Sequence, residues 1–349
     1  MHRDTLLKWL RTTDPERLAE LWRLADQARR QAVGDQVHLR GLIEVSNHCG
    51  RQCGYCGLWA DHRSLVRYRM SDDEIFGCAR QAVEFGYGTV VLQSGEDFGL
   101  SADRVAEWVR RIKAATPLAV TLSLGEREPD ELALWRAAGA DRYLLRFETS
   151  NRALYERIHP SRPGQRFDRF ELLGHLRRLG YEVGSGVMIG IPGQTYDDLA
   201  DDLQCFARLK LDMIGVGPYL RHPETPLADE PDAPAGEQSP STELMTYKVV
   251  ALARLLCPWA NIPATTALAT LNRRDGRELG LLRGANVVMP NLTPPKYRAL
   301  YEIYPEKACV AESGSTCHGC LAQRIAAIGR MPGQGRGDAV RVEACADSR

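Results

Sequence analysis

The chain has 349 residues, 44% of them hydrophobic and 26% charged, and its 45 basic side chains are balanced by 45 acidic ones. This balance gives no support for a nucleic-acid or anionic-membrane partner, because both attract a basic surface. No stretch approaches the roughly 18 apolar residues of a membrane span, and the N-terminus lacks the apolar core of a signal peptide. We therefore expect a cytosolic protein whose ten cysteines are mostly reduced and free to bind metal.

The first 36 residues predict a helical cap over one end of the fold. Asp14 before Pro15 is typical of a helix start, with Asp as N-cap and Pro in the first turn. Leu18, Leu21 and Leu24 then follow at helical spacing, which indicates an amphipathic helix.

From residue 37 onwards, apolar runs alternate with helical patterns. The expected strands are 37–46, 88–94, 117–124, 141–148, 183–191, 211–219, 261–268 and 285–290. The expected helices lie near 72–86, 101–115, 128–138, 167–179, 196–208, 241–256 and 274–283. Strands that are apolar almost throughout are buried on both faces, and their alternation with helices implies parallel pairing with right-handed crossovers. We therefore predict an α/β fold, a (β/α)8 TIM barrel over residues 37–300.

The remainder, residues 301–349, is expected to form a C-terminal extension. It carries three further cysteines, and from Gly329 onwards its glycine-rich sequence predicts a flexible tail. Within the barrel, residues 223–240 form the longest break in periodicity, which fits either a solvated loop or a lid over the strand ends.

Three cysteines follow the first expected strand within eight residues. Cys49, Cys53 and Cys56 have the spacing C-x3-C-x2-C, and thiolates this close can bind one metal centre. They are one ligand short of the four that a closed site requires. The spacing alone leaves three interpretations open: an iron–sulfur cluster with one open iron, a zinc site completed by a remote His or Cys, and a disulfide with a spare thiol. We favour the cluster with an open iron.

This cysteine spacing, with the aromatic Tyr55 directly before the last cysteine, resembles the signature of the radical S-adenosylmethionine (SAM) enzymes. The resemblance implies a [4Fe–4S] cluster whose open iron binds the amino and carboxylate groups of SAM. It also implies that the reduced cluster cleaves SAM to methionine and a 5′-deoxyadenosyl radical, for which an external one-electron reductant is needed. The protein would supply binding, orientation and exclusion of water.

Polar residues at the ends of the following strands are the candidates for binding SAM. Gln93-Ser94-Gly95-Glu96 ends the second strand and resembles the Gly-Gly-Glu turn that holds the SAM amino group in this family, with Ser94 in place of the first glycine. Thr121 and Ser123 lie on the third strand.

The fourth strand carries two opposite charges, Arg146 and Glu148, two residues apart. Residues at i and i+2 of a strand face the same way, so both side chains should point into the barrel, where charges are costly and often functional. A mutual salt bridge is the structural alternative. Arg169, early in the next helix, could hold the methionine carboxylate with its planar fork, or it could be an ordinary surface arginine.

Six further stretches resemble the [FeFe]-hydrogenase maturase family HydE: residues 91–97, 121–126, 143–149, 190–195, 217–227 and 262–267. They occur in the family's order between about residues 40 and 325. The chain has Phe147 where many family members have His, and we expect this side chain to face the helices.

This resemblance implies a long cavity with the cluster and SAM at its top. It implies that Arg146, Thr265 and Thr266 hold an anionic organometallic substrate, an iron bearing CO, cyanide and cysteine, and that Met213 and Tyr297 line the SAM pocket. Companion maturases are implied as partners.

The extension carries Cys309, Cys317 and Cys320, spaced C-x7-C-x2-C. Some members of the family have such a trio and bind an accessory iron–sulfur cluster, while others lack it, so we expect it to be dispensable for the chemistry. Zinc binding or oxidation is the alternative.

Two rival functions remain open from the sequence. Within the superfamily, the chain could be a mutase or a sulfur-inserting enzyme related to methylornithine synthase or biotin synthase, acting on an amino-acid-derived substrate. The rival from another class is a non-catalytic iron–sulfur scaffold or electron carrier, which should have four cysteines for each cluster.

Overall fold

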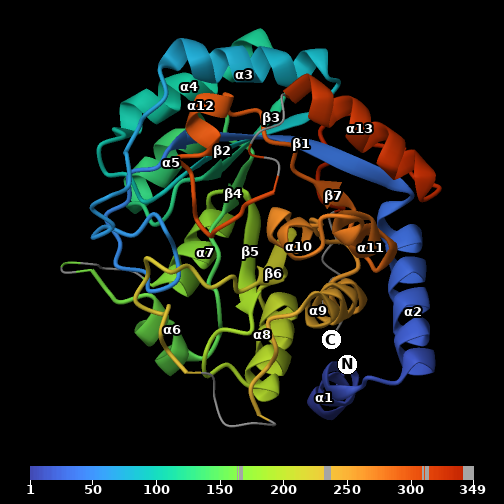
Figure 1. Ribbon diagram of the computed structural model, residues 1–349. Coiled ribbons are helices and arrows are strands. Elements are labelled where there is room, and N and C mark those ends of the chain that lie inside the picture. The colour runs from blue at the N-terminus through green and yellow to red at the C-terminus, as the bar shows by residue number, and fades with distance from the viewer. Residues whose placement is uncertain (163, 165–167, 232–236, 309, 311–313, 341–349) are drawn as a thin grey trace, which may run out of the picture.

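A computed structural model describes residues 1–340, apart from 163, 165–167, 232–236, 309 and 311–313 (Figure 1). Its strands form one sheet in the order β6-β5-β4-β3-β2-β1-β7, with β8 beside β1. All of the strand pairs are parallel, which confirms the predicted alternation of parallel strands and helices. The strands are β1 (Gln36–Ser46), β2 (Thr89–Ser94), β3 (Ala119–Ser123), β4 (Arg142–Leu144), β5 (Glu182–Ile189), β6 (Met213–Pro218), β7 (Val287–Val288) and β8 (Met331–Pro332).

The barrel is closed between β6 and β7 by single bridges, not by the full strand predicted at 261–268. Asn261 bridges Met213 on β6, and Pro263 bridges Val287 on β7. Pro263 has no N–H to donate to a longer ladder, and Thr265 caps a helix that begins at the next residue, so the extended segment ends there. The predicted fourth and eighth strands are also shorter than expected.

Helices surround the strands, as Figure 1 shows. In chain order they are α1 (Arg3–Arg11), α2 (Pro15–Val33), α3 (Asp72–Glu84), α4 (Ala102–Ala115), α5 (Pro129–Ala137), α6 (Arg152–Ile158), α7 (Arg169–Arg178), α8 (Tyr196–Arg208), α9 (Glu243–Leu256), α10 (Thr266–Leu271), α11 (Gly276–Leu282), α12 (Pro295–Arg298) and α13 (Gly314–Ala327). The N-terminal helices α1 and α2 pack mainly against α8 and α9. The segment predicted as a cap over a barrel end therefore lies against the outer helices.

Side chains at the helix starts explain where the helices begin. Ser71 and Glu74 form a capping box at α3, and Thr195 and Asp198 form another at α8. Asp14 accepts hydrogen bonds from two backbone N–H groups at the start of α2, as its position before Pro15 predicts. Each such cap satisfies N–H groups that the helix itself leaves unpaired.

The C-terminal tail returns to the N-terminal end of the barrel, so the predicted flexibility does not hold for residues 329–340. The backbone oxygen of Arg336 accepts hydrogen bonds from Thr89 and Arg142, and that of Gly337 accepts one from Arg40. The tail lies so close to β2 that a Cβ on Gly88 would fall 1.6 Å from the oxygen of Gly335. The tail is thus part of the barrel floor, while residues 341–349 lie outside the described part.

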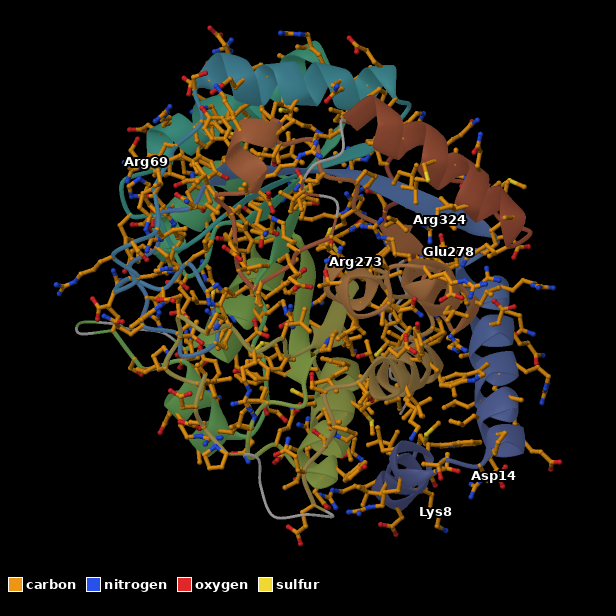
Figure 2. All side chains as sticks on the ribbon, viewed as in Figure 1. Lys8, Asp14, Arg69, Arg273, Glu278 and Arg324 are labelled. Carbon is orange, nitrogen blue, oxygen red and sulfur yellow. The ribbon has the colours of Figure 1, made fainter. Side chains whose placement is uncertain are left out.

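The helix α13 is fastened to α11 by an ion pair. Figure 2 shows Arg324 reaching from α13 to Glu278 on α11, and one of its N–H groups lies 2.7 Å from the carboxylate. None of the helices in the described part of the chain is both long and apolar enough to cross a bilayer.

Candidate active site

A cavity of about 340 Å³ runs inside the barrel. Alternate residues of the strands line it, such as Leu42 and Glu44 on β1 and Gly215 and Gly217 on β6. This alternation is what parallel barrel strands produce, because every second side chain points inwards. TIM-barrel interiors are normally filled by large branched side chains, and the two glycines of β6 leave space where such side chains would stand.

The cysteine loop lies over the C-terminal end of this cavity, and all three cysteines line it. Arg67 holds the loop by donating to the backbone oxygens of Asn47, Leu58 and Trp59. On the other side of the loop, the backbone N–H of Gly54 donates to the oxygen of Ile158 at the end of α6.

The three cysteine sulfurs differ from a closed zinc site in their spacing. Cys49, Cys53 and Cys56 do not have all of their Sγ atoms within 4.8 Å of one another, whereas thiolates on one tetrahedral zinc lie about 3.8 Å apart. Burial raises the pKa of all three thiols, that of Cys56 to about 12, and neighbouring sulfurs add to the effect for Cys53 and Cys56. A metal centre would remove this cost, because it binds the thiolates. The donor set of three thiols on one loop fits a cluster of several irons with one open iron.

The turn after β2 is packed directly against the cysteine loop. A Cβ on Gly95 would lie 2.4 Å from the oxygen of His48 and 2.8 Å from Cβ of Cys49, and the N–H of Gly50 donates to the oxygen of Glu96. The missing side chain at Gly95 thus lets the two loops approach each other, which places Glu96 beside the cysteines.

A buried network of charges lies next to the loop. Arg169 donates through Nε to Glu126 at 2.8 Å and lies 3.3 Å from Glu96 through Nη2. Arg51 lies 3.7 Å from Glu96 and 3.6 Å from Glu126. The two arginines thus balance the two carboxylates. Arg169 is a buried hub and not the surface arginine of the alternative interpretation.

His159 joins this network to the cysteines. Its Nδ1 lies 2.9 Å from Sγ of Cys53, and its Nε2 lies 3.0 Å from Nη2 of Arg169 and 3.2 Å from Glu126. Burial, followed by the charge of Arg169, lowers the pKa of His159 to about 3, so the ring is neutral. Burial and the charge of Glu126 raise the pKa of Glu96.

Arg146 and Glu148 lie on the same side of the chain, as their spacing predicts. Their side chains form an ion pair of 3.0 Å that lines the cavity, and Arg146 also donates to the oxygen of Val187. Glu148 has a φ of 62°, a left-handed conformation that costs a non-glycine residue energy and is found mostly at functional sites. Between them, Phe147 stacks on Phe170 of α7, so it faces the helices as expected.

The turn that carries Glu148 rests on a buried carboxyl group. Asp202 on α8 accepts hydrogen bonds from the backbone N–H and the hydroxyl of Ser150, two residues after Glu148. Burial raises the pKa of Asp202 to about 7. The folded protein therefore favours the protonated form of Asp202 at pH values where the unfolded chain has already lost that proton.

This shift predicts a pH-dependent stability. The pKa of Asp202 is raised from 3.8 in the folded state. The free energy of unfolding should therefore fall by up to about 1.4 kcal/mol per pH unit as pH rises from about 4 to 7. Above pH 7 it should level off. Asp202→Asn keeps the accepting oxygen and removes the charge. The free energy of unfolding of this variant, relative to that of the wild type, should therefore increase over the same pH range. Urea unfolding at several pH values tests this, with Asp201→Asn as control because that side chain is half exposed. Parallel curves for Asp202→Asn and the wild type would contradict the prediction.

The residues predicted to bind SAM and substrate come together with one exception. The cavity is lined by Tyr55, Gln93, Ser94, Gly95, Glu96, Thr121, Ser123, Arg146, Glu148, Arg169, Met213, Thr265 and Thr266. Tyr297 does not line it. Its ring stacks on Tyr68 at 4.5 Å and its hydroxyl donates to Glu74 on α3, because α12 turns that side chain outwards. Tyr301 and Tyr304 take its place in the cavity wall.

Sequence reasoning missed several charged residues of the wall. Among the described lining residues, six are cationic and three are acidic; the missed ones are Arg40, Glu44, Arg51, Arg277 and Lys307. Arg51 lies within the cysteine loop, and Glu44 on β1 forms an ion pair of 2.7 Å with Lys307. Arg40 and Glu44 lie four residues apart on β1 and therefore on one face of the strand. Two charges on one face of an otherwise apolar strand were the signal that could have revealed both residues.

The second cysteine trio is described only in part. Cys309 and the side chain of Cys317 lie outside the described residues, whereas Cys320 is an exposed free thiol on α13. Cys320 does not line the cavity. A second metal centre stays a prediction.

Comparison with known proteins places this site in a family. A profile of the Radical SAM superfamily matches residues 43–206, which span the cysteine loop and strands β2 to β5. The chain is 48% identical over 322 residues to the [FeFe] hydrogenase maturase subunit HydE of Thermotoga maritima, covering 92% of this chain and 89% of that protein. The chain belongs to the HydE family of radical SAM enzymes. This family uses a [4Fe–4S] cluster and SAM.

More distant relatives share the fold. The chain is 28% identical to 3-methylornithine synthase of Methanosarcina acetivorans, over 82% of this chain and 78% of that protein. A crystal structure of methylornithine synthase superposes with a TM-score of 0.80 at 26% identity, covering 95% and 94% of the two chains. The hydrogenase maturase HydG has the same fold, with a TM-score of 0.75 at 17% identity over 95% of this chain and 72% of that one.

Proposed function

We propose that this chain acts in the maturation of the [FeFe]-hydrogenase active site, as a radical SAM enzyme working on an organometallic substrate. The observation that carries the proposal is the 48% identity to a HydE protein over nine-tenths of both chains. The internal cavity supports it, because nearly all of the residues that the family resemblance assigns to SAM and substrate meet there.

Cys49, Cys53 and Cys56 would hold the [4Fe–4S] cluster, and SAM would lie across the strand ends beside it. The cluster and SAM together supply a 5′-deoxyadenosyl radical when bound. Two buried oxygens facing the cavity, Oε2 of Glu96 and Oγ1 of Thr121, lack a hydrogen-bond partner among the described residues. Buried polar atoms normally have partners, so they are suited to the ammonium and hydroxyl groups of SAM.

The substrate side of the cavity is suited to an anion. The excess of cationic over acidic side chains in the wall supports binding of a negatively charged complex. Arg146, Thr265 and Thr266 also line the cavity, and we assign them to the substrate. The substrate implied by the resemblance is a cysteine-bound Fe(CO)2(CN) complex, whose sulfur is the reacting atom.

This function requires partners. Companion maturases would deliver the iron complex and receive the product, and a one-electron donor would reduce the cluster. HydG, which shares the fold, is itself a maturase of the [FeFe]-hydrogenase. The experiment is a maturation assay with an apo-hydrogenase and the companion maturases. Hydrogenase activity should appear only when this chain, SAM and a reductant are all present, and equal activity without the chain would contradict the proposal.

A sulfur-inserting function is less well supported. Biotin synthase feeds sulfur from a second cluster held by cysteines on its barrel strands. Among the residues that the structure describes, the cavity wall here has no cysteine beyond the three of the loop, so a second cluster has no thiolates there. The mutase alternative is supported only by the more distant similarity to methylornithine synthase.

We expect the second cysteine trio to be dispensable for turnover. Replacing Cys309, Cys317 and Cys320 by alanine should remove an accessory metal centre, detected by iron and zinc analysis, and leave SAM cleavage within about twofold of wild type. The reason is that Cys320 lies on α13, outside the cavity wall. A variant that binds SAM but cannot process substrate would show the trio to be catalytic.

A further inference from the structure

The end of α6 is joined to the cysteine loop at three consecutive residues. The N–H of Gly54 donates to the oxygen of Ile158 at 2.8 Å, His159 contacts Cys53, and Arg51 donates to the oxygen of Pro160 at 3.2 Å. The proline follows the last turn and prevents the helix from continuing. His159 is therefore held by the backbone on both sides, with a side chain that is fully buried.

The sulfur, and not Nε2, decides which ring nitrogen must donate. Nε2 lies between a donor and an acceptor, 3.0 Å from Nη2 of Arg169 and 3.2 Å from the carboxylate of Glu126, so its neighbours are compatible with either tautomer. Nδ1 lies 2.9 Å from Sγ of Cys53, and a thiolate bound to iron can only accept. With a cluster bound, the ring therefore donates an N–H from Nδ1 to this sulfur.

Arg169 keeps its orientation through other contacts, so this arrangement does not depend on His159 alone. Its Nε donates to Glu126 at 2.8 Å, its Nη2 lies 3.3 Å from Glu96, and its Nη1 donates to the backbone oxygen of Arg146. The chain of contacts thus runs from Cys53 through the imidazole to Arg169, and from there to Glu96 in the cavity wall and to the segment that carries Arg146.

From this geometry we infer that His159 is a positioning residue that sets the reduction potential of the cluster through an N–H···S hydrogen bond to Cys53. A donor to a ligating sulfur withdraws electron density and stabilises the reduced cluster, which raises the potential. Arg169 orients the ring through its contact with Nε2. The inference rests on the proposed binding of a cluster by the three cysteines of the loop.

The test is a redox titration of the reconstituted cluster, followed by EPR in the absence of SAM. His159→Leu removes both contacts, His159→Gln keeps a polar group only near the position of Nε2, and His159→Asn keeps a donor near the position of Nδ1. We expect Leu and Gln to make reduction about tenfold less favourable, equivalent to about 59 mV for one electron, and Asn to stay near wild type. His175→Leu, on α7 outside the cavity wall, serves as control.

The outcomes separate this inference from the proposed function. A wild-type protein that assembles no cluster would overturn the proposed function, and the inference would fall with it. An intact cluster whose potential is unchanged in His159→Leu, or shifts equally in Leu and Asn, would overturn the inference alone. Should the variants lose the cluster, pulsed EPR of wild-type protein labelled with 15N-histidine decides: a nitrogen coupling to the reduced cluster supports the hydrogen bond, and its absence overturns it.

Discussion

Replacing Cys53 with alanine should abolish the reductive cleavage of SAM. Cys53 is the most deeply buried of the three loop cysteines, with 7% of its surface exposed, and it lines the cavity. Two thiolates cannot hold a cluster with one distinct open iron, so we expect 5′-deoxyadenosine formation to fall by at least about 10³-fold, a barrier increase of about 4 kcal/mol. Anaerobic reconstitution, iron analysis and chromatographic detection of 5′-deoxyadenosine measure this.

The same experiment on Cys49→Ala and Cys56→Ala should give the same loss. Cys205→Ala is the matched control, because Cys205 is also a buried free thiol but lies on α8. The control should keep full cleavage activity. Wild-type levels of cleavage by a Cys53→Ala protein would show that this loop does not hold the catalytic cluster.

Glu148→Gln and Arg146→Met should have different effects. We assign Glu148 to the cationic SAM and Arg146 to the anionic substrate, a division that leaves opposite charges adjacent in the loaded site. Glu148→Gln should weaken SAM binding, whereas Arg146→Met should spare SAM and impair turnover of the substrate. Calorimetric titration of SAM followed by turnover assays measures both effects.

The ion pair of 3.0 Å between these residues is the competing explanation. Removing one partner of a buried ion pair can lower the free energy of unfolding by about 3–5 kcal/mol. The decrease should be smaller here because 31% of the Arg146 side chain is exposed. Unfolding of the two variants must therefore be compared with that of wild type. Equal losses of SAM affinity in both variants would show that the residues act only as one structural pair.

Much of the fold could be predicted because its strands are continuous in sequence. Strands β1 to β6 occur where apolar runs predict them, since burial on both faces leaves an unambiguous pattern. The segment at 261–268 misled the prediction because Ile262 and Ala264 are buried like strand residues, although Pro263 limits the pairing. The tail after Gly329 was predicted to be flexible because it is rich in glycine. In the structure, its glycines instead permit close packing against Gly88.

The candidate site could be predicted where its residues lie in local motifs. Cys49, Glu96 and Arg146 were found because each belongs to a short pattern at a strand end. His159 was missed because it is a single residue after a short helix, and only the folded chain brings it to Cys53. Tyr297 was assigned to the cavity by the family resemblance, which does not give the direction in which a four-residue helix turns its side chains.

The most direct test of radical SAM activity is the fate of SAM when it is added to the reduced, reconstituted protein. We predict that 5′-deoxyadenosine and methionine form together, only after reduction, and only with the loop cysteines intact. A protein that holds a complete, reducible cluster and binds SAM, yet leaves SAM uncleaved even with the companion maturases and an iron source present, would contradict it.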